Sequence, residues 1–511
     1  MTSRVRAPEL PQDQTWLNTD HPLSLQNLKG RVVILDFWTY CCINCLHVLS
    51  DLKFLENKYK ESLTVIGIHS AKFDNEKEAE NIRQAILRYD IEHPVLVDSN
   101  FQVWQQYAVR AWPTLMVIDP EGYVIGYMSG EGNRDALDQL IGEMLQEHLA
   151  KGTVNHQKFS LVLEKQRQPL TTPLAFPGKV LADEFSDRLF IADSGHNRLV
   201  ISTLAGEVLH VVGTGKGGLR DGSFSEAEFF APQGMTFDAN SQVLYLADTE
   251  NHCLRKIDLK NQQVITIAGT GEQSRQIKPH SGQALETAMN SPWDLEKVDN
   301  RLLIAMAGSH QIWEMQLETG IVSNYAGTGA EACVDGKRDE AVFAQPSGIT
   351  TDGRELYVAD SEVSSIRAVG LFEDMPVRTV CGSGELFGFG DKDGKRSDVR
   401  LQHCLGVVYV PDYLWVADTY NHKIKRVDTY TGLCQTMLGE GKAGYQDEQG
   451  KKALFSEPSG LSAIAAHLYI ADTNNHVIRQ VDLGTFEVTT LELPGLCAPE
   501  VCTPTSTSTI D

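Results

Sequence analysis

The sequence predicts a multidomain protein, in which an α/β domain comes first and an all-β domain built as a six-bladed β-propeller follows. Length favours more than one domain, because 511 residues exceed what one hydrophobic core normally serves. Over residues 1–150, apolar strand patterns alternate with helical patterns. Beyond residue 173, one motif recurs at nearly regular intervals, with anchors at positions 193, 248, 306, 360, 418 and 472. We therefore expect domains at 1–150 and 173–495.

Composition narrows the range of partners and the compartment. The formal net charge is −23 and both domains are acidic, which argues against nucleic acid or an anionic membrane surface as the main partner. No run of about 18 apolar residues could span a bilayer, and the first residues lack the apolar segment of a secretory signal. Ten cysteines are too dilute for a disulfide-stapled secreted fold. We expect a cytoplasmic protein that interacts with other proteins.

The first domain has the pattern of an α/β sandwich. A β-branched apolar run at 32–37 predicts a buried strand, and leucines at 46, 49, 52 and 55 predict the helix that follows. A later helix, capped by Asn133, keeps helical apolar spacing to Leu145. Further expected elements are strands near 63–69, 93–98, 114–119 and 123–127 and a helix over 75–89.

The chemistry is expected in the two-thiol loop between the first apolar strand and the helix after it. Cys42 and Cys45 form a C-x-x-C pair at this strand-to-helix junction, which is typical of redox motifs. The first cysteine lies at the helix N-terminus, where unpaired N–H groups and the helix dipole stabilise a thiolate. The thiolate is the nucleophile of thiol-disulfide exchange. Cytoplasmic conditions then favour reduction of partner disulfides.

The residues around this loop resemble the thioredoxin-like family, and in particular its thiol-disulfide reductase branch. The matching stretches are residues 36–38, 42–45 and 109–115. The resemblance implies that Cys42 and Cys45 are a catalytic dithiol and that Pro113 is a cis-proline facing it. It also implies that Asp36 takes the proton of the resolving thiol. An apolar strand raises the pKa of a carboxylate, which suits a general base near neutral pH.

Aromatic side chains beside the dithiol are expected to form the groove for the substrate protein. The expected groove residues are Trp38, Tyr40 and Trp112. The loop departs from the family pattern, because Ile43-Asn44 lacks the usual proline and Cys41 replaces an aromatic residue. We expect Cys41 to modulate the redox potential. We expect neither a resident metal nor another cofactor.

Two other interpretations of the cysteines stay open at this stage. The fold could keep them as small buried hydrophobic residues, since free cysteine packs well in a core. Alternatively, Cys41, Cys42 and Cys45 could hold a metal or an iron–sulfur cluster shared by two chains, because three thiols are too few for a complete tetrahedral site. His47 is a candidate fourth ligand, although a lone histidine is more often a surface residue.

The repeats of the second domain centre on an Asp-Thr-x-Asn-His segment, which is clearest at 248–252, 418–422 and 472–476. Four short alternating runs per repeat and six repeats predict a six-bladed β-propeller. Asp and Asn suit the turn, because their side chains bond the local backbone and tolerate left-handed conformations. The segment resembles the NHL repeat. Its Asp and His residues recur in every clear copy, so we expect them to brace the blades rather than catalyse.

Two segments fall outside the predicted domains. Residues 151–172 lose the helical period and contain one apolar stretch, 159–163, so we expect a linker with one possible strand. The Thr- and Ser-rich tail at 496–511 is expected to be disordered.

A thioredoxin-like domain followed by an NHL-type propeller resembles the NHL-repeat-containing protein 2 family over nearly the whole chain. The resemblance implies a redox protein. The resulting hypothesis is a thiol-disulfide oxidoreductase that reduces protein disulfides through Cys42 and Cys45, with the propeller as the platform that binds the partner. The alternative is a redox-inert protein-interaction scaffold.

Overall fold

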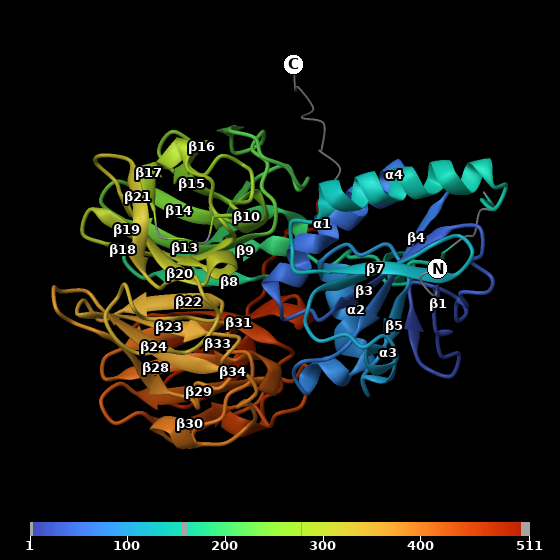
Figure 1. Cartoon of the computed structure of the whole chain (residues 1–511). Helices are drawn as coiled ribbons and strands as arrows, with labels where there is room; N and C mark the ends of the chain where they lie inside the picture. Colours follow the sequence, from blue (N-terminus) through green and yellow to red (C-terminus); the bar gives the residue numbers. More distant parts are fainter. Residues whose placement is uncertain (1–3, 156–160, 277, 279, 502–511) are drawn as a thin grey trace. The chain divides into compact units, whose positions relative to one another are not determined.

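The computed structural model describes residues 4–155, 161–276, 278 and 280–501 (Figure 1). The chain forms two compact units, Met1–Pro169 and Leu170–Asp511. The first is an α/β domain of the thioredoxin-like type and the second is a six-bladed β-propeller, as the sequence predicted. Among the described residues, no helix combines the length and the apolar character needed to cross a membrane.

The first unit is organised around one seven-stranded sheet. Its central strand is β3 (Val32–Trp38), which runs parallel to β4 (Leu63–His69) and antiparallel to β6 (Thr114–Ile118). The full order is β1 (Val5–Arg6), β7 (Tyr123–Ser129), β6, β3, β4, β5 (Val95–Val97) and β2 (Trp16–Leu17).

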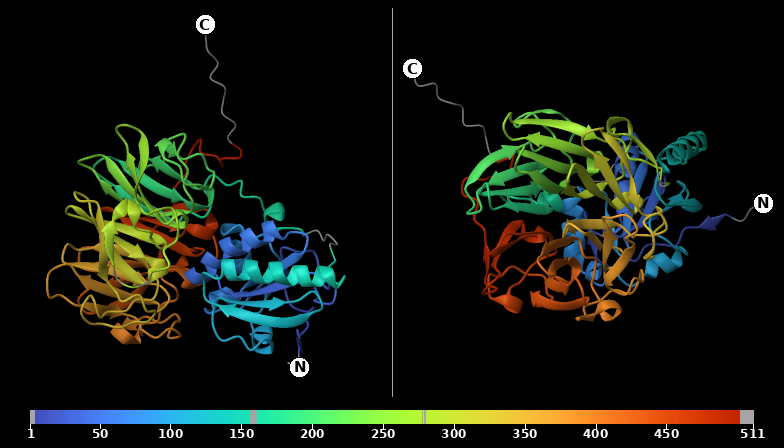
Figure 2. Two further views of the ribbon diagram at one scale, coloured as in Figure 1. Left: turned by 45° about the horizontal axis from the view of Figure 1, so that its top comes forward. Right: turned by 90° about the vertical axis from the view of Figure 1, so that its left-hand side faces the viewer.

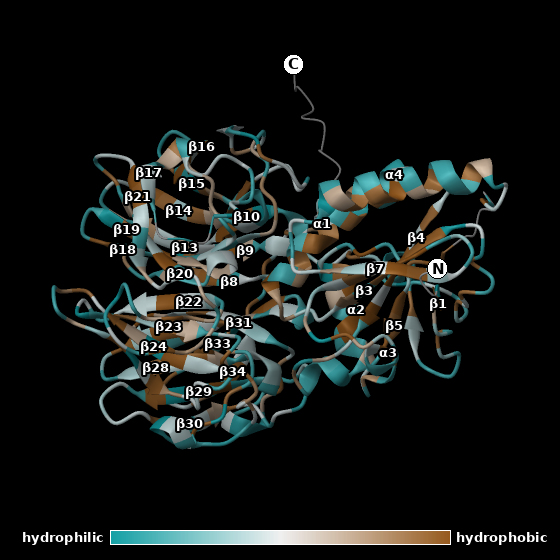
Figure 3. Cartoon of the chain, viewed as in Figure 1, coloured by the Kyte–Doolittle hydropathy of each residue, from teal (hydrophilic) through white to brown (hydrophobic). Residues whose placement is uncertain are grey.

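Helices cover both faces of this sheet, so β3 is buried along its whole length. On one face, α1 (Ile43–Lys58) and α4 (Arg134–Ala150) pack against alternate residues of β3, including Val32 and Ile34. On the other face, Val33, Leu35 and Phe37 pack against Val103 of α3 (Gln102–Gln106). Hydrophobic residues therefore follow the central strands continuously (Figure 3). The remaining helices are η1 (Asn75–Lys77) and α2 (Ala79–Arg88).

The segment after residue 150 differs from the expected linker. The first unit extends to Pro169, and residues 164–167 form a short helix, α5 (Glu164–Arg167). Glu164 is buried because it exchanges hydrogen bonds with Asn18: the Glu164 N–H donates to Asn18 Oδ1 at 2.7 Å, and the Asn18 N–H donates to Glu164 Oε1 at 3.3 Å. Of the expected strand at 159–163, residues 161–163 are not in a strand and the others lie outside the described residues.

The propeller consists of six antiparallel sheets, each made of consecutive strands (Figure 2). The blades in chain order are β8 (Lys179–Asp183), β9 (Arg188–Asp193), β10 (Arg198–Ser202) and β11 (Val208–Val212); β13 (Pro232–Asp238), β14 (Val243–Asp248), β15 (Cys253–Asp258) and β16 (Gln263–Ala268); β18 (Pro292–Val298), β19 (Arg301–Met306), β20 (Gln311–Gln316) and β21 (Ile321–Ala326); β22 (Pro346–Thr351), β23 (Glu355–Asp360), β24 (Ser365–Gly370) and β25 (Val377–Cys381); β27 (Gly406–Val410), β28 (Tyr413–Asp418), β29 (Lys423–Asp428) and β30 (Leu433–Leu438); and β31 (Pro458–Ala463), β32 (His467–Asp472), β33 (Val477–Asp482) and β34 (Val488–Thr490).

Short strands and helical turns complete the blades. In three blades a short strand from the preceding loop adds to the outer edge: β12 (Gly222–Ser223), β17 (Ser281–Gln283) and β26 (Gly394–Lys395). In five blades a 3-10 turn joins the second and third strands: η2 (Ser194–His196), η3 (Thr249–Asn251), η5 (Ala307–Ser309), η7 (Thr419–Asn421) and η9 (Thr473–Asn475). The other 3-10 turns are η4 (Ala284–Glu286), η6 (Arg396–Asp398) and η8 (Gly450–Lys452).

One position of the repeat joins each blade to the next. It is a histidine in four blades, whereas in the first and fourth blades Asn197 Oδ1 and Ser364 Oγ accept the N–H groups of Ala231 and His403. His422 Nδ1 accepts the backbone N–H of Glu457 at 3.0 Å, and His252 and His310 make the same bond to the following blades. The last of these bonds closes the ring, because His476 Nδ1 accepts the N–H of Phe176 at 3.0 Å. The innermost strands β31 and β8 also lie side by side. Among the described strands, none is exchanged between the first and last blades, so packing and hydrogen bonds hold the two ends of the propeller together.

The repeated aspartates lie inside their blades, as the bracing interpretation expects. Asp472 is fully buried and accepts bonds from Asn475 at 2.8 Å and from Arg479 at 2.8 Å. The third blade departs from this pattern, since Met306 and Trp313 occupy the positions of the aspartate and the arginine. The blade still forms, because both replacements pack in an apolar cluster.

The beginning of the tail differs from the expected disorder. Ala498 is buried, and Pro499 lies so close to Gly215 that a Cβ on that glycine would be 2.6 Å from the proline ring. Residues 502–511 of the predicted tail lie outside the described residues.

Candidate active site at the dithiol loop

The dithiol lies at the carboxyl end of β3, where the chain turns into α1. Cys42 caps the helix with extended backbone angles, and its carbonyl accepts the N–H groups of Cys45 at 3.0 Å and Leu46 at 3.2 Å. The side chain of Cys42 is partly exposed, whereas Cys45 is fully buried. The strand-to-helix junction therefore presents one thiol to solvent and holds the other beneath it.

A buried glutamate that the sequence analysis missed holds the loop in place. Glu76, in η1, is fully buried, and its Oε1 accepts the backbone N–H of Cys41 at 2.9 Å. Its Oε2 accepts the N–H groups of Lys72 at 3.0 Å and Phe73 at 2.9 Å. One carboxylate thus ties the dithiol loop to the segment after β4. No sequence motif indicates this role, because Glu76 lies far beyond the dithiol in the chain, in a polar, glutamate-rich stretch.

The third cysteine of the loop points into the protein. Cys41 is buried, and its Sγ lies 3.7 Å from Thr39 Oγ1. His47, the suggested fourth metal ligand, is also buried, and its Nδ1 lies 2.5 Å from Glu131 Oε2. Cys41 and His47 are therefore engaged in contacts with other side chains.

Asp36 is the buried carboxylate behind the dithiol. It lies on the α1 face of β3, with no exposed surface, and neither carboxylate oxygen has a hydrogen-bond partner among the described residues. Burial raises the pKa of Asp36 to about 7, since a charge is poorly solvated in the core. A positive charge on His93 opposes this rise and the Glu56 carboxylate adds to it. Asp36 can therefore both accept and return a proton near neutral pH.

The buried thiol needs such a base. Burial raises the pKa of Cys45 well above its ordinary value, and contact with the Cys42 sulfur raises it further. The Asp36 charge acts in the same direction. Cys45 is consequently a thiol, not a thiolate, until a base removes its proton.

Pro113 lies close to the dithiol loop in the sheet. The peptide bond between Trp112 and Pro113 is cis. Phe37 of β3 pairs with Thr114 at the start of β6, so Pro113 is level with the end of β3 that leads into the dithiol. The dithiol loop and Pro113 are far apart in the sequence, but they follow and precede neighbouring strands at the same end of the sheet.

The expected aromatic groove is only partly present. Trp38 is fully buried and Tyr40 nearly so, because both rings pack on buried His69, with centroids 4.9 Å and 5.5 Å from the imidazole. These two residues form core and do not line an open groove. Trp112 is partly exposed and packs on Trp104 at a centroid distance of 4.7 Å. Trp112 is the one of the three that a docked protein can contact.

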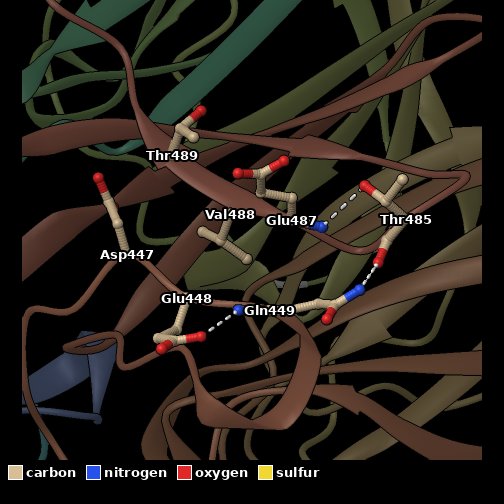
Figure 4. A pocket seen from close by; sticks show the side chains of 7 residues that line it. All are labelled: Asp447, Glu448, Gln449, Thr485, Glu487, Val488 and Thr489. Atoms are coloured by element: carbon tan, nitrogen blue, oxygen red, sulfur yellow. Dashed lines mark hydrogen bonds between the residues drawn. The ribbon is translucent and has the colours of Figure 1, made fainter.

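Two further polar clusters do not resemble binding sites. Asp119, Glu121 and His148 lie close enough to hold a cation, but Arg4 already pairs with Asp119 at 2.5 Å and with Glu121 at 3.2 Å. On the sixth blade, a shallow pocket is lined by polar groups that bond one another (Figure 4). There the side-chain amide of Gln449 donates to the Thr485 carbonyl at 2.7 Å.

Comparison with known proteins identifies the family. A sequence model described as thioredoxin-like matches residues 30–124. The chain is 40% identical over 540 aligned positions to NHL repeat-containing protein 2 of Gallus gallus, covering 98% of this chain and 73% of that protein. The chain belongs to the NHL repeat-containing protein 2 family.

The chain is also similar to one plant protein and, over its first domain, to one bacterial protein. It is 45% identical to the Arabidopsis thaliana protein SUPPRESSOR OF QUENCHING 1, chloroplastic, covering 96% of this chain and 48% of that protein. It thus spans about half the length of the plant relative. Over 119 residues it is 28% identical to the thiol-disulfide oxidoreductase ResA of Bacillus thuringiensis, covering 23% of this chain and 66% of that protein.

Proposed function

We propose that this member of the NHL repeat-containing protein 2 family is a thiol-disulfide oxidoreductase that reduces disulfides of partner proteins. The observation that carries the proposal is the layered arrangement of the dithiol: partly exposed Cys42 at the start of α1, buried Cys45 one turn below it, and the unpaired carboxylate of Asp36 beneath. The similarity of the first domain to a protein named thiol-disulfide oxidoreductase supports the same reaction class.

The arrangement supports a two-step reaction. The Cys42 thiolate attacks a disulfide of the partner, forming a mixed disulfide and releasing one partner thiolate. Asp36 then accepts the proton of Cys45, and the Cys45 thiolate attacks the Cys42 sulfur. The Cys42–Cys45 bond forms, and the second partner thiolate leaves. The partner gains two electrons and, from water, two protons, while the protein dithiol becomes a disulfide.

In this proposal the propeller selects the partner. β-propellers commonly mediate protein interactions, and long segments connect the blades of this one, as between the end of β11 and the start of β13. The partner is a protein with an accessible disulfide, which docks against partly exposed Trp112, next to buried Pro113. Neither a metal nor a cofactor enters the reaction.

The proposal includes a reducing compartment, because the oxidised dithiol must be re-reduced after each turnover. The dilute cysteines and the lack of an apolar signal segment favour the cytoplasm. The Arabidopsis relative is named as chloroplastic, so members of this family need not share one compartment.

A trapping experiment on the full chain tests the function. Wild-type protein should reduce a nitrobenzoate disulfide, which releases one coloured thiolate in each step. Cys45→Ser should stop after one release and hold the mixed disulfide on Cys42, because nothing resolves it. Cys42→Ser should lose the fast step, and Cys253→Ser, at a buried free thiol of the propeller, should behave as wild type.

The scaffold alternative predicts a different result. If the wild type releases no more thiolate than Cys42→Ser, and Cys45→Ser holds no mixed disulfide, the dithiol is inert and the oxidoreductase proposal is wrong.

A further inference from the structure

Three buried polar groups without hydrogen-bond partners gather around Gly67. Gly67 pairs with Asp36 in the parallel ladder of β3 and β4, so a side chain at position 67 would lie next to the carboxylate. Glycine leaves that space to other residues. A Cβ on Gly67 would lie 2.9 Å from Trp38 Nε1 and 3.4 Å from His93 Nε2. Both of these nitrogens and the Asp36 carboxylate are unpaired among the described residues.

His93 connects this interior region to the surface. It belongs to the segment just before β5 and is 3% exposed. Its Nδ1 lies 3.4 Å from Oε2 of Glu56, near the end of α1. The side chain of Glu56 is 29% exposed. Exposure thus rises from Asp36 through His93 to Glu56, which reaches solvent near the end of α1 opposite to Cys42.

The charge state of His93 fits a group that exchanges protons. Burial lowers the pKa of a histidine, but at His93 the carboxylates of Glu56, Asp36 and Glu92 together more than offset this, Glu56 most of all. The net result is a pKa above the ordinary value. His69, which is equally buried on β4 but has no such carboxylate, has a pKa lowered to about 3 by burial.

We propose that His93 and Glu56 form a proton relay that carries the proton of Cys45 from Asp36 to solvent. This inference rests on the proposed function, since it concerns the step in which Cys45 resolves the mixed disulfide. Glu56 and His93 touch neither the substrate nor the sulfur atoms, so they are positioning and relay residues for Asp36.

The relay moves one proton from Cys45 to solvent in each turnover. Asp36 takes the proton of Cys45 as the Cys42–Cys45 bond forms and the partner thiolate leaves. The Asp36 carboxyl and His93 Nε2 are not hydrogen-bonded to each other, so in this relay a water molecule in the space beside Gly67 carries the proton between them. The imidazole then releases its Nδ1 proton to Glu56. Glu56 exchanges it with water. Asp36 is then a carboxylate again, and no oxidant or reductant beyond the dithiol and the partner disulfide is needed.

The titratable groups around Asp36 and His93 come from three parts of the first unit. From α1 and its cap they are Cys42, Cys45 and Glu56. Glu92 and His93 come from the segment before β5, and His69 comes from β4. The pH dependence of the resolving step should thus report mainly Asp36, perturbed by Glu56 and His93.

Two variants of the full chain test the relay through the second, resolving phase of thiolate release, measured from pH 5 to 9. His93→Gln removes a positive charge beside Asp36, so the profile should move to higher pH. Glu56→Gln removes a negative charge, so its profile should move to lower pH. In both variants the plateau rate should fall about tenfold, because general acid–base assistance is worth at least that much. His148→Gln, at another buried histidine, is the matched control.

Several results would overturn the relay. If the pH profile and the plateau rate of the resolving phase are those of the wild type in both variants, Asp36 exchanges its proton by another route. The relay is then wrong, although the proposed oxidoreductase function is unaffected. An equal loss of rate at every pH, without opposite shifts, would indicate a structural role only. If His93→Gln does not fold, Glu56→Gln decides alone, because Glu56 is partly exposed. If the wild type shows no resolving phase, the proposed function and the relay both fail.

Discussion

Two sets of buried carboxylates distinguish the units of this protein. Asp36 in the first unit and Asp472 in the propeller have no exposed surface. Asp472 accepts hydrogen bonds from Arg479, Asn475 and the backbone of Ser456. Asp36 has no hydrogen-bond partner among the described residues. A buried charge without partners costs free energy. The propeller carboxylates are thus held by cations and N–H groups that stabilise their blades, whereas the unpaired state of Asp36 supports its proposed role as a base.

The largest loss of stability is expected when a buried carboxylate of the propeller loses its cation and so becomes unpaired like Asp36. Arg479→Met leaves Asp472 buried without its cation, which should lower the free energy of unfolding by about 4 kcal/mol. Urea unfolding of the full chain, followed by fluorescence, measures the loss. As a control, Arg378→Met removes a partly exposed ion pair with Glu355 and should cost less than about 1 kcal/mol. If both variants lose the same free energy of unfolding, the buried pair of Asp472 and Arg479 contributes no more to stability than a partly exposed pair.

Replacing Asp36 by the neutral Asn should stabilise the first unit and also remove the proposed base. The pKa of Asp36 is raised to about 7 in the folded state, so its penalty is absent below pH 4, grows as pH rises to 7 and is complete above it. Asp36→Asn should therefore raise the free energy of unfolding by up to about 4 kcal/mol at pH 8 and change it little at pH 4.

The same variant should slow the resolving step about a hundredfold, since the general base is lost. Unfolding at the two pH values and the kinetics of thiolate release are measured on the same preparation. A variant that is destabilised at pH 8, or that resolves as fast as wild type, would mean that Asp36 is an ordinary core residue.

The smallest loss of stability is expected at Glu76, a buried carboxylate of the first unit that does have hydrogen-bond partners. Glu76 bonds three backbone N–H groups, including that of Cys41, and so resembles the propeller carboxylates. Glu76→Gln keeps the shape but loses the charge-assisted acceptor, which should cost about 2 kcal/mol. Unfolding at pH 7 and the rate at which iodoacetamide modifies Cys42 report the loosened loop. Unchanged alkylation together with unchanged stability would show that the loop does not depend on Glu76.

Much of the fold was predictable because its signals are local. The β-branched run of β3, the leucines of α1 and the cysteines between them lie within one continuous segment, 32–59. The propeller was predictable because the same turn recurs, and a turn is specified by the residues within it. Errors arose where a segment has no strong local pattern. The stretch after residue 150 has the local pattern of a linker, although the Glu164 N–H donates a hydrogen bond to the distant Asn18 near the start of the chain.

The sequence by itself determined the dithiol, its position between strand and helix, the proline beside it and the number of blades. Only the tertiary structure decided which side chains support the dithiol. Trp38 and Tyr40 proved to be core because His69 lies against them. Glu76 and His93 were brought to the loop and to Asp36 from segments well beyond the dithiol in the chain. The physical reason is that strand and turn propensities are read along the chain, whereas burial and electrostatic partners depend on which distant segments pack together.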